Sequence, residues 1–184
     1  MTDPRVTPGA ITPSAIKTIY RGRIFTVQIE SITLPSGHAL EAEIIRHPGS
    51  VVIVPVRDDG GIVLVRQYRH ALGRHVWELP AGSLKPGEHV EKAAGRECQE
   101  EIGLIPAALH YLGAYYPTPG YCDEKMHFFR ATGLRIPGTA DAQAHPDEDE
   151  DIETGTFDRD AIRAMMAAGE IVDLKTIGGL ALLG

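Results

Sequence analysis

Residues 82–104 read GSLKPGEHVEKAAGRECQEEIGL, a pattern that predicts a turn followed by a single helix. Pro86 and Gly87 supply the turn signal, and no proline interrupts the residues after them within this stretch. Gly103 is placed to end the helix, because glycine readily adopts the left-handed backbone conformation of a helix C-terminus. We therefore expect a helix over about residues 89–102.

The expected helix carries three glutamates on one side. Projected at about 100° per residue, Glu97, Glu100 and Glu101 fall within an arc of roughly 100°. Cys98 lies on an adjoining apolar stripe that is suited to burial. Carboxylates this close repel one another, and carboxylate oxygens are the ligands that Mg²⁺ and Mn²⁺ prefer, so the spacing favours a bound divalent cation. Arg96 precedes Glu100 by four residues and is placed to orient it.

The same stretch resembles the Nudix box, whose pattern is G-x5-E-x7-R-E-U-x-E-E-x-G-U, where U is a bulky apolar residue. Its fixed positions match Gly82, Glu88, Arg96, Glu97, Glu100, Glu101 and Gly103, and Leu104 matches the last apolar position. Cys98 at the first apolar position is a mild departure, since cysteine packs like a small hydrophobic residue. The alternative is a helix whose acidic face is simply solvated.

The amino-acid composition limits the classes of protein to which this chain can belong. The chain has 184 residues, 43% of them hydrophobic, which is enough for one domain with a real core. Its net charge of −7 argues against binding to a nucleic-acid backbone. Two cysteines, no signal peptide and no long apolar run predict a cytoplasmic protein without a disulfide framework or a membrane span.

Strand patterns occupy most of the remaining chain. Residues 17–34 and 38–46 alternate apolar and polar side chains and predict a three-stranded antiparallel sheet within an N-terminal part, 1–46. Within 47–184 we expect strands on both sides of the 89–102 helix and two helices near the end. In the first of these strands, Pro55 suggests an edge or bulge position. This succession predicts an α+β fold.

The resemblance implies a Nudix fold, with a mixed β-sheet sandwiched between helices, for about residues 45–184. The N-terminal sheet resembles the swapped region of the dimeric ADP-ribose pyrophosphatase branch, which implies a homodimer. The implied activity is Mg²⁺-dependent hydrolysis, with Mn²⁺ as a substitute, of ADP-ribose to AMP and ribose 5-phosphate. Another nucleoside diphosphate sugar, such as ADP-glucose or GDP-mannose, is the alternative substrate. A ligand-sensing Nudix domain without catalysis is the alternative from another class.

The resemblance also implies roles for residues of the box. Glu97 and Glu101 would be the principal metal ligands, with Glu100 and the carbonyl oxygen of Ala81 as further ligands. Glu88 would support the loop through Arg96 rather than bind a metal directly.

A general base is expected in the acidic run 146–151, directly before a predicted strand over 152–157. Acidic runs are more often solvated loops, but this one resembles the segment that carries the catalytic glutamate in ADP-ribose pyrophosphatases. By that resemblance Glu148 is the favoured base. Glu150 is the runner-up, and it could instead contact a metal.

Five residues are candidates for substrate binding. Arg46 and Arg69 match positions that face the diphosphate or the base in relatives, and a solvated strand arginine is the alternative reading. Phe25 could stack on adenine from a partner subunit, or simply pack in the core. The segment around Pro119, sixteen residues beyond Gly103, resembles the Ser/Thr-Pro-Gly loop of the ADP-ribose branch. In the same loop Glu124 could accept hydrogen bonds from ribose hydroxyls, or be an exposed carboxylate.

Overall fold

The computed structural model describes residues 10–139, 141 and 151–184. These residues form two compact units. The first contains the chain up to Pro48 together with Thr118–Glu124, and the second contains Gly49–Pro117 and Lys125–Gly184.

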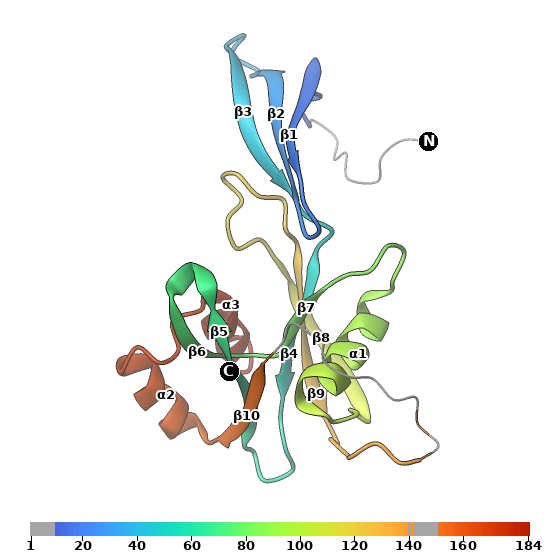
Figure 1. Ribbon diagram of the computed structural model, residues 1–184, viewed down its shortest axis with the longest axis vertical. Coiled ribbons are helices and arrows are strands. Elements are labelled where there is room, and N and C mark those ends of the chain that lie inside the picture. The colour runs from blue at the N-terminus through green and yellow to red at the C-terminus, as the bar shows by residue number, and fades with distance from the viewer. Residues whose placement is uncertain (1–9, 140, 142–150) are drawn as a thin grey trace. The chain divides into compact units, whose positions relative to one another are not determined.

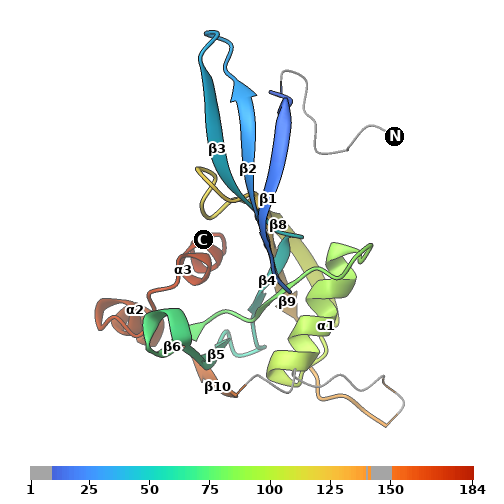
Figure 2. The same ribbon diagram turned by 45° about the horizontal axis from the view of Figure 1, so that its top comes forward.

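The first unit is built on a three-stranded antiparallel sheet in the order β1-β2-β3. Its strands are β1 (Ala15–Arg21), β2 (Thr26–Thr33) and β3 (Ala39–Arg46), which confirms the alternating pattern as strands (Figure 2). Residues 118–124 join this sheet next to its last strand. The N–H of Ile45 donates to the carbonyl of Tyr121 at 2.7 Å, and the N–H of Asp123 donates back to Ile45 at 3.1 Å.

The second unit holds a mixed sheet in the order β7-β4-β9-β8. It consists of β4 (Ser50–Pro55), β7 (Ala81–Ser83), β8 (Ala108–Tyr115) and β9 (Met126–Thr132), with β4 and β9 parallel and the other pairs antiparallel. Although β4 lies between β7 and β9, β7 pairs only with residues 50–52, so at Pro55 the strand has β9 alone as a neighbour, which fits the expected edge position. Proline is tolerated there because it is the last residue of the strand.

A second sheet of this unit is antiparallel, in the order β10-β5-β6. Its strands are β5 (Ile62–Arg69), β6 (Arg74–Glu78) and β10 (Ile152–Phe157), and the short 3₁₀ helix η1 (His70–Leu72) connects β5 to β6. The strand expected directly after the acidic run is therefore present as β10.

Three helices complete the unit: α1 (Val90–Ile102), α2 (Arg159–Ala167) and α3 (Leu174–Ala181). Gly103 ends α1 with a φ of 68°, as its position predicts. Asp158 and Asp173 cap α2 and α3 by accepting the N–H groups of Ala161 and Thr176 at 2.7 and 2.9 Å. In the described part of the chain no helix is long and apolar enough to cross a membrane.

Strand β4 divides the core into two layers, because successive side chains of a strand point to opposite faces. Val51 and Ile53 pack with Ala93 and Ala94 of α1. On the other face, side chains of β4 pack against α2 and the segments beside it; this cluster includes Val52, Val54, Leu79, Ile162, Met165 and Ile171. Figure 1 shows α1 on one side of the sheet and α2 with α3 on the other. This confirms the predicted α+β fold with a mixed sheet between helices.

Candidate active site

Helix α1 presents its glutamates from a firmly anchored position. Ala94 and Cys98 are fully buried against the sheet, and burial raises the pKa of the Cys98 thiol to about 12, so this cysteine acts as core. On the adjoining stripe, Glu97 and Glu101 are only 8% and 5% exposed. A helix face held this closely to the sheet keeps its carboxylates at fixed positions.

Arg96 contacts three of the carboxylates. Its Nη1 donates to Glu97 at 2.7 Å and to Glu100 at 2.6 Å. Its Nε and Nη2 each donate to Glu88 at 2.9 Å. Hydrogen bonds from Arg96 lower the pKa of Glu88 to about 2, so this carboxylate stays charged. Glu88 also accepts the backbone N–H of Lys85 at 3.0 Å and thereby holds the loop before α1.

The turn before α1 approaches the same carboxylates through its backbone. Ala81 and Gly82 belong to β7, and the N–H of Ala81 donates to Glu101 Oε2 at 3.0 Å. A Cβ atom added at Gly82 would lie 2.0 Å from Glu97 Oε1, a distance that no side chain can occupy. Glycine is needed at this position because the carboxylate takes the space of a side chain.

Donor chemistry and charge at this face fit a divalent cation. Arg96 pairs with Glu88, Glu97 and Glu100, Lys85 Nζ lies 4.0 Å from Glu100, and Glu101 is buried on the same face of α1, so the four carboxylates outnumber the cations paired with them. Such a concentration of buried negative charge is costly unless a cation compensates it. The described residues contain no preformed cluster of three or more His, Cys, Asp or Glu ligands, and Arg96 already engages one oxygen each of Glu97 and Glu100. The ligand roles of Ala81, Glu97, Glu100 and Glu101 therefore stay predictions.

Arg69, at the end of β5, belongs to the same unit as α1. Its Nε and Nη2 each donate to Glu78 at 2.7 Å, and the hydrogen bond to Glu78 raises the pKa of the guanidinium. Although this edge is engaged, 40% of the Arg69 side chain is exposed. A guanidinium held at one edge can still bind a phosphate with the other.

In the first unit, Arg46 is held by its neighbours. Its Nε donates to Glu30 at 3.1 Å and its Nη1 to Asp123 at 3.0 Å. Burial by itself would lower the pKa of Arg46, but the hydrogen bonds with these carboxylates outweigh it and raise the pKa. The contact ties the 118–124 segment to the β1-β2-β3 sheet.

The other three candidates of the first unit are accessible or half-buried. Phe25 lies in the turn between β1 and β2 with its ring 6.1 Å from that of Tyr20, and it is exposed rather than part of a core. Pro119 lies exposed in a turn. Glu124 Oε1 is 3.8 Å from His47 Nδ1. Their substrate roles stay predictions, while Glu148 and Glu150 lie outside the described residues.

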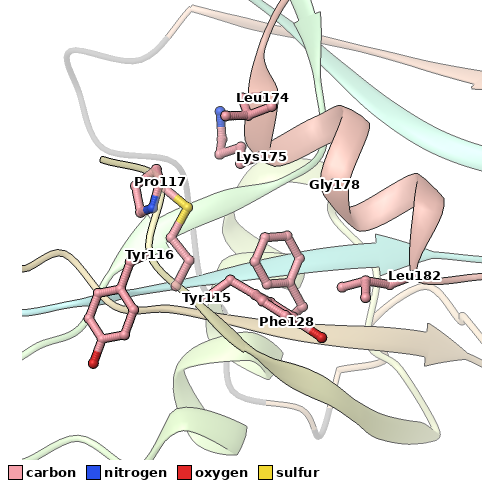
Figure 3. Close-up of a pocket in the computed structure, with 9 residues that line it drawn as sticks. Tyr115, Tyr116, Pro117, Phe128, Leu174, Lys175, Gly178 and Leu182 are labelled. Carbon is pink, nitrogen blue, oxygen red and sulfur yellow. The ribbon is translucent and has the colours of Figure 1, made fainter. Parts of the chain in front are cut away.

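The second unit also contains an apolar pocket of about 280 Å³ that the sequence did not indicate. Tyr115, Tyr116 and Phe128 line it together with residues of α3, among them Lys175 (Figure 3). The pocket joins segments that are about 60 residues apart, so no local pattern could reveal it.

Comparison with known proteins relates this geometry to a family. The model of the NUDIX domain matches residues 46–174, a span that includes α1, its four carboxylates and Arg69. The chain belongs to the Nudix family.

Among the relatives of this Nudix chain, the ADP-ribose pyrophosphatase of Bacillus subtilis (strain 168) is 35% identical over 158 residues, covering 86% of this chain and 84% of the relative. The ADP-ribose pyrophosphatase of Mycobacterium tuberculosis is 36% identical over 165 residues, covering 89% and 78%. A crystal structure of an ADP compounds hydrolase matches with a TM-score of 0.79 at 24% identity, covering 94% of this chain and 91% of that one. The last likeness supports the Nudix fold alone.

Two charged residues of the second unit, Glu78 and Lys175, take part in contacts that no local pattern indicates. Glu78 is the buried last residue of β6, four positions before the box glycine Gly82, and a buried carboxylate needs a cationic partner. The sequence therefore indicates that Glu78 needs a cationic partner if it is buried, but it does not indicate which residue that partner is. Lys175 lies in the first turn of α3, where a lysine is ordinarily solvated, so its position alone does not indicate a buried ion pair.

Proposed function

We propose that this Nudix chain hydrolyses the diphosphate bond of ADP-ribose, giving AMP and ribose 5-phosphate, with Mg²⁺ as the preferred cation and Mn²⁺ as a substitute. The observation that carries the proposal is the buried pair Glu97 and Glu101 on α1, which packs against the backbone of Ala81 and Gly82. This arrangement provides fixed, hard oxygen ligands on a rigid element beside a loop. The two relatives that bear the name ADP-ribose pyrophosphatase support the choice of substrate.

The chemistry requires an activated water, charge neutralisation and an in-line approach. When bound, the divalent cation supplies Lewis-acid polarisation of the diphosphate oxygens and lowers the pKa of a bound water. Glu97, Glu100, Glu101 and the carbonyl of Ala81 would hold it. Arg96 orients Glu97 and Glu100, while Glu88 fixes Arg96 in turn.

Proton transfer and substrate binding fall to other residues. Glu148, with Glu150 as the runner-up, would take the proton from the water as its oxygen bonds to phosphorus and the bridging P–O bond breaks. The bridging oxygen leaves as part of the second phosphate. The exposed edge of Arg69 would bind the diphosphate. For Arg46, Phe25, Pro119 and Glu124 of the first unit, a role in substrate binding stays a prediction from the family resemblance.

Turnover of a substrate panel tests this function. We expect kcat/KM for ADP-ribose to exceed that for ADP-glucose and GDP-mannose by at least about tenfold, since a mispaired polar group on the sugar costs about 1–3 kcal/mol. The diphosphate is common to all three, so contacts to it cannot discriminate between them. A higher kcat/KM for ADP-glucose or GDP-mannose would identify that nucleotide sugar as the substrate instead. Inactivity on all three with Mg²⁺ or Mn²⁺ would contradict it and favour a ligand-sensing domain.

We also propose a homodimer formed through the first unit. Strand β1 is exposed along its whole length, and it carries Ile16, Ile19 and Tyr20 with more than half of each side chain accessible. An apolar edge strand of this kind is normally covered. Sedimentation velocity should show a dimer that Ile16→Asp weakens and that Ile136→Asp, at an 80% exposed position of the second unit, leaves intact. An active wild-type monomer would refute the proposal.

For the compartment, we propose the cytoplasm. Both cysteines of the chain, Cys98 and Cys122, are free thiols, which is typical of proteins in a reducing environment.

A further inference from the structure

The carboxylate of Glu78 is the centre of a buried ionic cluster that the proposed chemistry does not use. Glu78 lies at the end of β6 and is 2% exposed. Arg69 donates to both of its oxygens, and Lys175 forms an ion pair with Oε2. Lys175 is also 2.9 Å from Asp173 Oδ2, so strands β5 and β6 and the first turn of α3 meet at one point. Burial would raise the pKa of Glu78, but hydrogen bonds and the charges of Arg69 and Lys175 outweigh it and lower the pKa.

Such a cluster adds little net stability. Removing charges from water costs several kcal/mol per ion, and a buried ion pair is often no more stabilising than apolar residues of the same volume. Stability alone therefore does not account for two cations on one buried carboxylate. What the cluster does provide is orientation, because Glu78 fixes one edge of Arg69 and Lys175 fixes Glu78.

The same turn of α3 also holds the backbone next to Glu78. The N–H of Leu79 donates to the Thr176 hydroxyl at 2.8 Å, and that hydroxyl donates to Asp173 at 2.6 Å. Thr176 is fully buried. The helix can approach this closely because Gly179 has no side chain: a Cβ there would lie 2.5 Å from Leu79 Cδ1.

From Leu79 the chain runs directly to the carboxylates of α1. The carbonyl of Pro80 accepts the N–H of Ile53 at 2.9 Å, so β4 holds the backbone there. Ala81 then contacts Glu101, and Gly82 lies against Glu97. Only Pro80 lies between Leu79, which binds Thr176, and Ala81, which faces the carboxylates. A shift of Leu79 would therefore be passed on to Ala81 and Gly82.

We propose that Lys175 and Thr176 are positioning residues for the hydrolysis: Lys175 acts through Glu78 on the guanidinium of Arg69, and Thr176 acts through Leu79 on the Ala81–Gly82 backbone. The inference rests on the proposed function for its kinetic consequence. A guanidinium already held at one edge loses less conformational entropy when it binds a diphosphate.

The competing explanation is that Lys175 itself binds the substrate, since it also lines the pocket of Figure 3. Its burial argues against this, because only 11% of the side chain is exposed and its ammonium group already contacts two carboxylates. The two explanations differ in one measurable respect. A residue that acts through Arg69 has no effect once Arg69 is gone, whereas a direct ligand does.

A double-mutant cycle on the whole protein separates them. We expect Lys175→Met to raise KM for ADP-ribose about tenfold with a smaller change in kcat, the size typical of coupled residues in one ionic network. In an Arg69→Met background the same change should alter KM less than about twofold, and Lys175→Arg should restore most of the wild-type KM. Arg163→Met, which removes an exposed ion pair with Asp160 on α2, is the matched control and should leave KM unchanged. If the fold-changes in KM caused by Lys175→Met and Arg69→Met multiply in the double variant, the proposal is overturned.

Amide hydrogen exchange tests the backbone half without substrate. Thr176→Val should speed exchange of the Leu79 N–H at least about tenfold, and Thr176→Ser, which keeps the hydroxyl, should not. The N–H of Gly103, which donates to Gln99 at the end of α1, serves as an internal control. Unchanged exchange at Leu79 in Thr176→Val would refute the backbone role. If the wild-type protein cleaves no nucleotide sugar, the proposed function fails, while the exchange experiment still decides whether α3 holds this segment.

Discussion

Glu101→Gln is expected to lower kcat for ADP-ribose by about a thousandfold. Lewis-acid stabilisation of transition-state charge is worth several kcal/mol, and each increment of about 1.4 kcal/mol is a factor of ten in rate. The substitution keeps the size of the side chain, and the amide oxygen of glutamine can still accept the N–H of Ala81 that Glu101 accepts at 3.0 Å. What it removes is one of the charges that would hold the cation.

Two further measurements separate this role from a structural one. The melting temperature without metal should not fall, because neutralising one carboxylate in a group where carboxylates outnumber their cationic partners relieves repulsion. The rise in melting temperature that Mg²⁺ produces should shrink, because the cation then binds the native state more weakly. Glu91→Gln, at an exposed position in the first turn of the same helix, is the control and should leave both quantities unchanged. Undiminished hydrolysis by the Glu101 variant would contradict the metal role.

Gly82→Ala is expected to lower kcat at least about a hundredfold with little loss of stability. The added methyl group would lie 2.0 Å from Glu97 Oε1, so the carboxylate must move. A displacement of about 1 Å in a catalytic group can cost a factor of about 100 in rate. Because the displaced atoms are the flexible end of a side chain, the backbone need not shift, and the melting temperature should stay close to that of the wild type.

Gly95→Ala is the matched control for this change. Gly95 lies within α1, and a Cβ there would meet no atom within 4 Å. Alanine in a helix interior is more stable than glycine by up to about 1 kcal/mol, so this variant should melt about 2–4 °C higher and keep full activity. Full activity of Gly82→Ala as well would show that the position of the Glu97 carboxylate does not matter for catalysis.

Local sequence patterns predict many of the helices and strands of this protein. The acidic face of α1, its end at Gly103 and the alternation that gives β1, β2 and β3 follow from periods of two and 3.6 residues, which need no knowledge of distant residues. The spacing of the box glutamates is also a local pattern. Together with the family match over 46–174, it predicts metal-dependent diphosphate hydrolysis as the class of chemistry. The limits of local reasoning appear at β4, because its neighbours β7 and β9 come from distant parts of the chain and no local pattern names them.

By itself, therefore, the sequence determined which elements form and which of them carries the carboxylates, because backbone hydrogen bonding and amphipathic burial act over a few residues. Only the tertiary structure decided the partners of distant residues: residues 118–124 join β3 through Arg46 and Asp123, and Lys175 meets Glu78 from 97 positions away. These contacts depend on how distant segments pack to exclude water and to pair buried charge, and no periodicity in the sequence encodes that pairing.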